Sequence, residues 1–246
     1  MLIEATVLDI LAQAETDGNA FRLPPGQLDR KTYEAVNKVL TAAGGKWNKK
    51  AGAHLFEGDA AEAIEPILLT GTYQRTKQDF GQFDTPPDLA ERIVAMAGIK
   101  HGMGVIEPSA GLGNIASEVL DAGGEVMCIE IDAKRVEALK RRGFRSIIHA
   151  DFLSLHGLSP HDRVVMNPPF AKQADIDHVL HAAKFLKPGG RLVGIMSQSV
   201  LYRSDRKATA FRDQVAAWGG EFEELPAGAF KSAGTMVRAC IVSFDR

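Results

Sequence analysis

Short apolar runs and amphipathic stretches alternate along the chain from about residue 80 to its end. The apolar runs predict buried strands at residues 103–107, 125–130, 146–149, 162–166 and 190–196. Apolar positions at helical spacing predict helices at residues 88–97, 114–122, 133–142, 174–186 and 205–218. Runs near 221–224 and 236–244 predict a closing antiparallel pair. Such alternation indicates an α/β fold with a mostly parallel sheet covered on both faces and a ligand site beyond the carboxyl ends of its strands.

The first part of the chain follows a different pattern. We predict a small α+β unit at residues 1–78 and a larger domain at residues 79–246. Helices are expected over 2–14, 30–43 and 59–69, with a strand at 20–23 and a β-hairpin at 46–56. Asp29 and Asp59 are the residue type that caps helix N-termini, and each precedes a predicted helix.

Composition excludes several classes of protein. The 246 residues are 45% hydrophobic and 24% charged, and no apolar run approaches the roughly 18 residues of a membrane span. The N-terminus has neither a basic region nor a long apolar core, so we expect a cytoplasmic protein without a signal peptide. Cys128 and Cys240 lie in apolar runs and indicate no disulfide framework. His178 and His181 have no cysteine or carboxylate cluster beside them, so we expect packing or surface roles and no metal site.

Net charge is −2, so any nucleic-acid surface has to be local. Between Arg22 and Lys50 seven basic residues face two acidic ones, a local balance of +5, and Trp47 lies among the lysines. This segment is either a nucleic-acid patch or a solvated face with Trp47 in the core of the unit. A second basic cluster follows the strand at 190–196. The candidate phosphate contacts are Lys46, Lys49, Lys50, Arg203, Arg206 and Lys207.

The loops that follow the predicted strands carry the candidate chemistry. Glu107 to Asn114 is a tight turn with two glycines, which lets the backbone approach a ligand. Glu130 ends the next strand, 23 positions later, where a carboxylate can accept both hydroxyls of a ribose. Asp151 and Phe152 follow the third strand and suit an adenine amino group and ring. Together these loops predict a site for a nucleoside-containing ligand.

The fourth strand ends in Asn167-Pro168-Pro169-Phe170. The prolines restrict the backbone and remove donors, so the Asn167 side-chain oxygen and the Pro168 carbonyl can both accept from one amino group. Phe170 offers a flat face for a planar base. An aromatic amine is a poor nucleophile because its lone pair is delocalised, and two acceptors favour a tetrahedral nitrogen. The tetrapeptide therefore predicts N-methylation of such an amine, with water taking the proton.

From about residue 80 to 246 the chain resembles class I S-adenosylmethionine-dependent methyltransferases, and among them the DNA adenine-N6 enzymes. The resemblance implies a Rossmann-like seven-stranded sheet with a C-terminal antiparallel hairpin and S-adenosylmethionine as cofactor. It implies that Asn167, Pro168, Pro169 and Phe170 are catalytic. The cofactor-binding residues that it implies are Phe83, Thr85, Pro86, Glu107, Pro108, Gly111, Gly113, Glu130, Ile131, Asp151 and Phe152.

The favoured function is transfer of a methyl group to adenine N6 in DNA, with the base flipped out of the duplex and stacked on Phe170. The chain ends after the hairpin, where many DNA methyltransferases have a target-recognition domain, so sequence selectivity is in doubt or falls to residues 1–78. The alternative is an amino group of a ribosomal or transfer RNA base, or of a protein glutamine. A non-catalytic cofactor-binding subunit is a third interpretation. Oligomeric state does not follow from the sequence.

Overall fold

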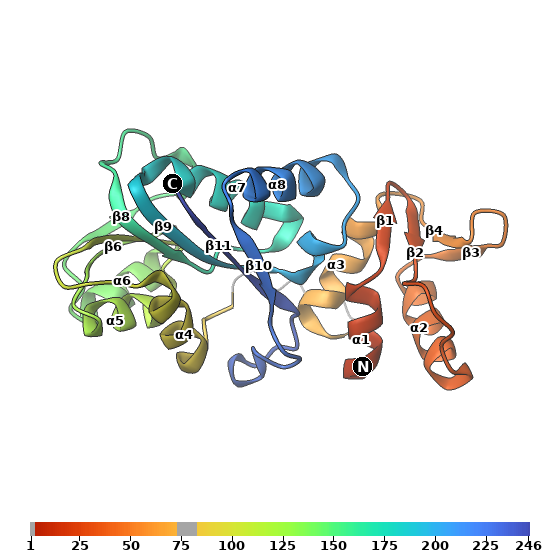
Figure 1. Ribbon diagram of the computed structural model, residues 1–246. Helices are drawn as coiled ribbons and strands as arrows, with labels where there is room; N and C mark the ends of the chain where they lie inside the picture. Colours follow the sequence, from red (N-terminus) through yellow and green to blue (C-terminus); the bar gives the residue numbers. More distant parts are fainter. Residues whose placement is uncertain (1–2, 73–82) are drawn as a thin grey trace. The chain divides into compact units, whose positions relative to one another are not determined.

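A computed structural model describes residues 3–72 and 83–246, and its helices and strands follow the predicted order (Figure 1). The chain divides into two compact units. The N-terminal unit contains Met1–Phe80, Ser197–Asp213 and Leu225–Ala239. The sheet unit contains Gly81–Met196, Gln214–Glu224 and Cys240–Arg246.

The sheet unit is organised around a seven-stranded sheet with the order β10-β11-β9-β8-β5-β6-β7. Its parallel strands are β5 (Gly104–Pro108), β6 (Glu125–Glu130), β7 (Ile147–His149), β8 (His161–Met166) and β9 (Leu186–Ser197). The last two strands, β10 (Glu221–Glu224) and β11 (Ala239–Asp245), pair antiparallel. The predicted Rossmann-like α/β fold is confirmed. All loops that follow the parallel strands therefore open at one edge of the sheet.

Helices cover both faces of this sheet because each has one apolar face. Figure 1 shows α4 (Pro87–Ala97), α5 (Asn114–Asp121) and α6 (Ala133–Arg141) on one face and α7 (Ala174–Ala182) on the other. The predicted helix at 205–218 is α8 (Arg206–Ala217). No helix in the described ranges is long and apolar enough to cross a membrane. Cys128 and Cys240 are thiols buried within the sheet, as small apolar residues would be.

The N-terminal unit has its own antiparallel sheet, in the order β1-β2-β4-β3. Its strands are β1 (Glu15–Asp17), β2 (Ala20–Arg22), β3 (Lys46–Asn48) and β4 (Ala53–Leu55). Three helices supply apolar residues to one core: α1 (Ala5–Ala12), α2 (Arg30–Ala42) and α3 (Ala60–Thr70). The predicted caps are confirmed, since Asp29 accepts from Thr32 N and Asp59 from Glu62 N. Strand β1 was not predicted because it is short and polar.

The observed division differs from the predicted boundary at residue 78, because later segments also belong to the N-terminal unit. A parallel bridge joins Thr16 to Arg203, and the Ser204 hydroxyl donates to Thr16 O. Arg238 forms an ion pair with Asp9. Such long-range pairing has no local signal in the sequence. The predicted strand over 236–244 consequently begins later, at Ala239.

Candidate active site

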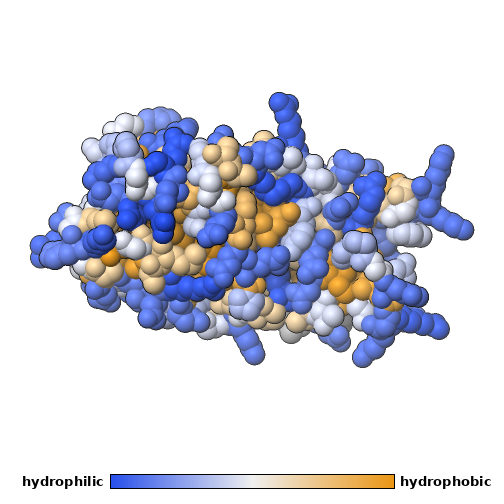
Figure 2. Space-filling view, viewed as in Figure 1, coloured by the Kyte–Doolittle hydropathy of each residue, from blue (hydrophilic) through white to orange (hydrophobic). Residues whose placement is uncertain are grey.

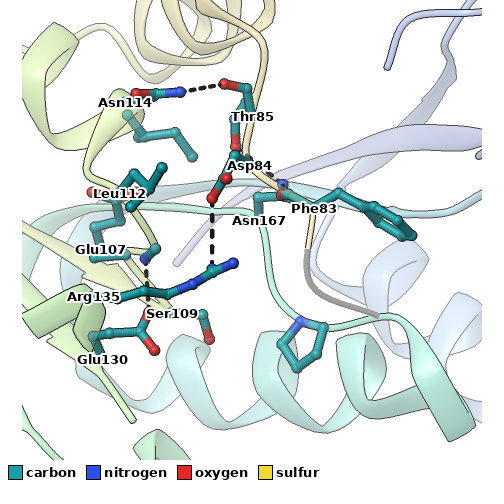
Figure 3. A pocket seen from close by; sticks show the side chains of 14 residues that line it. Phe83, Asp84, Thr85, Glu107, Ser109, Leu112, Asn114, Glu130, Arg135 and Asn167 are labelled. Atoms are coloured by element: carbon teal, nitrogen blue, oxygen red, sulfur yellow. Dashed lines mark hydrogen bonds and ion pairs between the residues drawn. The ribbon is translucent and has the colours of Figure 1, made fainter. Parts of the chain in front are cut away.

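The loops after β5, β6 and β8 meet in one pocket of the sheet unit, shown in Figure 3. The space within it, including the part open to solvent, is about 400 Å³. The predicted residues that line it are Phe83, Thr85, Glu107, Gly111, Glu130, Asn167 and Pro169. An adjoining pocket beyond β7 is lined by the predicted residues Glu130, Ile131, Asp151, Phe152 and Pro169. Because Glu130 and Pro169 line both, one elongated ligand can extend from the first pocket into the second.

Glu130 is buried, and backbone amides orient its carboxylate. Gly111 N donates to Oε2 at 2.7 Å and Asp132 N donates to Oε1 at 2.8 Å. Each carboxylate oxygen has a second lone pair, so both remain able to accept from a ligand. The contacts arise because Glu130 ends β6 while Gly111 lies in the turn after the neighbouring strand β5. The charge is therefore placed where the two pockets meet.

Glu107 lies one strand away and is only 2% exposed. Its Oε2 has no hydrogen-bond partner among the described residues. Burial raises the pKa of this carboxyl well above its ordinary value, and the nearby Glu130 charge adds to the rise. An unpartnered buried oxygen beside a pocket suits a ligand that donates hydrogen bonds or carries positive charge.

Asp84 and Arg135 also line this pocket, where a dashed line in Figure 3 joins them. Arg135 Nη1 lies 3.5 Å from Asp84 Oδ1, an ion pair without a hydrogen bond, and that oxygen is buried. Arg135 comes from the first turn of α6, and sequence reasoning missed it because nothing in its local pattern marks it. Asp84 and Asn114 also line the pocket, although the sequence analysis assigns a role to neither. Asn114 Nδ2 donates to Thr85 O at 2.8 Å, which joins the start of α5 to the segment before α4.

Asn167 follows β8 and is half-buried. Its Nδ2 donates to Phe83 O at 2.9 Å and to Thr85 Oγ1 at 3.0 Å. Because a carbonyl oxygen can only accept, these bonds identify the amino end of the amide. The other end, Oδ1, has no hydrogen-bond partner within the described ranges and is available as an acceptor. Two contacts thus orient the side chain whose oxygen the sequence analysis expects to act as an acceptor.

Phe170 does not present a face to a ligand in this structure. Its ring is 1% exposed and lies 6.3 Å from the Phe83 ring, centroid to centroid. The sequence predicts that a base stacks on Phe170. In this structure no face of the ring is accessible to a base, because the ring packs inward. Pro168 is buried too, whereas Pro169 lines both pockets.

The two glycines of the turn after β5 have different roles: one lines the pocket and the other allows close packing. Gly111 lines the pocket with a φ of 58° and donates to Glu130. Gly113 has a φ of 81°, and a Cβ there would lie 2.7 Å from Leu139 and Phe144 side chains. Gly113 therefore serves packing and does not line the pocket, contrary to its predicted contact. Neither Pro86 nor Pro108 lines either pocket.

The second pocket has an aromatic wall that includes a histidine. Phe152 is buried, and its ring centroid lies 5.8 Å from that of His178 and 4.9 Å from that of His181. Burial lowers the pKa of His178, which keeps the imidazole neutral. Both histidines are buried and pack against Phe152, one of the two roles expected for them. In the described part of the chain, no group of three or more His, Cys, Asp and Glu side chains could hold a metal ion. His178 also lines the pocket, which sequence reasoning missed.

The six candidate phosphate contacts differ in exposure. Lys46, Lys49 and Lys50 are exposed around the hairpin of β3 and β4. Arg203 is 7% exposed, and its Nε donates to Asp205 at 2.6 Å. The predicted phosphate contact of Arg203 has no exposed charge behind it in this structure, because the guanidinium is buried and paired with Asp205. Arg206 is exposed and Lys207 half-buried, both at the start of α8.

Comparison with known proteins defines the class. The model of the methyltransferase small domain family matches residues 88–222, more than half of the chain. The chain belongs to this family. The family is one of S-adenosylmethionine-dependent methyltransferases, and the predicted cofactor is thereby confirmed.

Individual relatives are more distant. A "Ribosomal RNA small subunit methyltransferase A" from Leifsonia xyli subsp. xyli is 27% identical over 175 residues, which cover 66% of this chain and 60% of the relative. A protein of the same name from Dehalococcoides mccartyi is 29% identical over 121 residues, which cover 47% of this chain and 40% of the relative. The chain thus spans about half the length of these relatives.

Among solved structures, a dimethyladenosine transferase from Plasmodium falciparum is similar in fold. The TM-score is 0.52 at 17% identity, and the match covers 67% of this chain and 64% of that one. At this identity the likeness supports the fold alone.

Proposed function

We propose that the chain transfers a methyl group from S-adenosylmethionine to the exocyclic amino group of an RNA base, with adenine in ribosomal RNA as the first candidate. The observation that carries this proposal is the orientation of Asn167, whose Oδ1 points away from two acceptors and is free to accept from an amine. The names of the relatives favour RNA as the substrate. The DNA adenine expected from the sequence is not confirmed by the comparisons.

The residues of the two pockets fit the cofactor. The Glu107 oxygen without a hydrogen bond and the Asp84 carboxylate suit the ammonium group of its methionine part, and Arg135, the ion-pair partner of Asp84, suits the carboxylate. Glu130 would accept from the ribose hydroxyls. Asp151 and Phe152 would contact the adenine, in the adjoining pocket. When bound, the cofactor supplies a methyl group on a positively charged sulfur.

Asn167 would act on the other reactant. Its Oδ1 accepts an N–H of the target amine, and the Pro168 carbonyl would accept the second. Two acceptors would draw the nitrogen toward a tetrahedral geometry and localise its lone pair, so that it could take the methyl group as the carbon–sulfur bond breaks and the cofactor leaves as a neutral thioether. The bonds to Phe83 O and Thr85 Oγ1 keep the amide oriented before the substrate arrives, so little reorganisation is needed.

The proton of the amine needs no dedicated base. It is lost after the nitrogen has gained the methyl group and become acidic, and water can accept it. His178, the histidine of the adjoining pocket, already bonds Ala174 O through Nδ1. It lies on the aromatic wall beside Phe152, so we assign it packing and no proton transfer.

The test is to incubate the purified chain and labelled cofactor separately with ribosomal RNA, DNA and protein, followed by analysis of the digested products. The proposal predicts label in N6-methylated adenosine from RNA. Label in DNA adenine would restore the sequence-based interpretation, and label in a glutamine amide would favour the protein alternative. Binding of the cofactor without any labelled product on these substrates would contradict the proposal.

A further inference from the structure

A row of side chains crosses the sheet of the N-terminal unit and ends in an exposed tryptophan. The strand registers align Thr16 with Phe21, Phe21 with His54, and His54 with Trp47. Directly opposed residues in an antiparallel sheet share a face. The first three side chains are buried, whereas Trp47 on the edge strand β3 is 51% exposed. Of the two sequence-based alternatives, a core position for Trp47 is therefore excluded.

The indole packs against a histidine that is itself held by a hydrogen bond. Its ring centroid lies 5.1 Å from that of His54, and His54 Nε2 bonds Asn37 Oδ1 of α2 at 2.9 Å. Burial lowers the pKa of His54, which keeps this imidazole neutral. Tyr33 lies one helical turn before Asn37, on the same side of α2, and is 39% exposed. The indole thus contacts His54 at an interplanar angle of 60°, and about half of the tryptophan remains exposed.

Positive charge gathers around this tryptophan. Lys46 precedes it on β3, and Lys49 and Lys50 lie in the turn that follows. None of the three lysines forms an ion pair within the described part of the chain. Figure 2 shows mainly hydrophilic side chains, some extended into solvent, over the end of the unit that carries β3 and β4. The acidic residues of the unit lie mostly before Arg22 and after Lys50 in the sequence.

We propose that Trp47 and the lysines of the β3–β4 hairpin bind unpaired nucleotides, with a base stacked on the exposed face of the indole and the phosphates beside Lys46, Lys49 and Lys50. Every base has a face that can stack, and the lysines supply affinity for the backbone without sequence information. The choice of RNA as the strand rests on the proposed function. The stacking surface itself rests only on the geometry of the hairpin.

This arrangement favours single strands over duplexes. In a duplex the base faces are already stacked on one another, so an indole on a hairpin reaches only edges and backbone. Lysines alone would bind either form. The tryptophan therefore gives the surface its preference for single strands, and the lysines raise its affinity for nucleic acid at low salt.

Tryptophan fluorescence tests the proposal, because the chain has only two tryptophans. In a Trp218→Phe variant, all tryptophan emission comes from Trp47. Addition of single-stranded oligoadenylate of about 12 nucleotides, without cofactor, is expected to quench it. Trp47→Leu is expected to weaken binding roughly 5- to 100-fold and Trp47→Phe less, since phenylalanine keeps an aromatic face. Trp218→Phe is the matched control, expected to bind like the parent, because Trp218 packs on Phe244 in the sheet unit.

Circular dichroism and thermal unfolding of each variant separate lost binding from lost folding. Unchanged affinity of Trp47→Leu, no quenching at saturation, or equal binding of a duplex of the same length would overturn the proposal. Equal binding of single-stranded DNA would keep the stacking surface and remove the choice of RNA. With a methylated substrate in hand, Trp47→Leu should raise KM and leave kcat unchanged. If no substrate is methylated, the binding experiments still decide, so this inference and the proposed function can fail separately.

Discussion

Glu130 ends β6 and Asn167 follows β8, so the two residues lie on either side of β5 at one edge of the sheet. The hydrogen bonds that orient their side chains run in opposite directions. Glu130 accepts two backbone N–H groups, which orient a negative charge. Asn167 donates two hydrogen bonds through its amide nitrogen, to Phe83 O and Thr85 Oγ1, which leaves a neutral acceptor oxygen. At this edge, the side of β5 toward β6 thus presents a charge, and the side toward β8 presents an uncharged oxygen. This difference matches a cationic cofactor on one side and a neutral amine on the other.

The comparison predicts that substitutions at Asn167 and at Glu130 impair different steps, methyl transfer at the first and cofactor binding at the second. Asn167→Ala should lower kcat roughly 100- to 1,000-fold, the range seen when one oriented polar group is removed from a reacting centre. Cofactor affinity should stay near that of the parent, because the side chain acts on the amine. Single-turnover methyl transfer with saturating cofactor measures the loss.

Asn167→Asp sharpens this prediction. A carboxylate keeps an acceptor oxygen and loses the donors that bond Phe83 O and Thr85 Oγ1, so it should retain more activity than alanine. Turnover of Asn167→Ala at the parent rate would remove Asn167 from the mechanism. Equal losses for both variants would show that orientation matters more than the acceptor.

The loop that orients Glu130 should depend on packing behind it. Gly113→Ala would place a Cβ 2.7 Å from Leu139 and Phe144, at a φ of 81°. We expect a loss of about 2–4 kcal/mol in the free energy of unfolding, from left-handed strain and overpacking together. Gly98→Ala is the control, since its φ is 59° and the space is open, and should lose only about 1–2 kcal/mol. Denaturant unfolding measures both, and equal losses would contradict the packing role.

Glu107 differs from Glu130 because it has an unpartnered oxygen, and this should appear as a pH dependence. Its folded pKa lies above the ordinary value of 4.5, so the folded chain keeps a proton that the unfolded chain releases. The contribution to stability is full below about pH 4.5 and is lost as the pH rises toward the folded pKa, by at most about 1.4 kcal/mol per pH unit. Glu107→Gln should remove this slope. Thermal unfolding of both proteins without cofactor, from pH 5 to 8, makes the comparison, and parallel curves would contradict the account.

The smallest expected effect lies outside the sheet edge altogether. Replacing Lys46, Lys49 and Lys50 with glutamine should reduce the slope of log affinity against log salt by up to about 2 for single-stranded RNA. Cofactor affinity should not change, because these lysines line neither pocket of the sheet unit. Fluorescence anisotropy at several salt concentrations measures the slope, and an unchanged slope would remove the hairpin as the site of phosphate contact.

Much of this could be predicted because local rules decide it. The alternation of apolar runs and amphipathic stretches fixes the α/β sheet, and Asp29 and Asp59 cap the helices that they precede. Parallel strands bring their carboxyl ends to one edge, so the loops containing Glu130 and Asn167 could be placed together from the sequence alone.

The rest depends on contacts between distant parts of the chain. Nothing near Arg135 shows that it lies opposite Asp84, about 50 positions earlier in the sequence. The inward packing of Phe170 against Phe83 depends on the same kind of contact. Gly113 looked like a ligand contact because glycine permits both close approach and tight packing, and only the positions of Leu139 and Phe144 distinguish the two.

Calorimetry of cofactor binding tests the central claim, that one sheet edge separates a cofactor side from an amine side. Glu130→Ala should weaken S-adenosylmethionine binding at least about tenfold, since it removes charge-assisted hydrogen bonds of roughly 1.5–3 kcal/mol each. Asn167→Ala should bind like the parent, as should Glu137→Ala, a control at an exposed carboxylate of α6. Parent-like binding by Glu130→Ala, or equal weakening in Glu130→Ala and Asn167→Ala, would contradict the account.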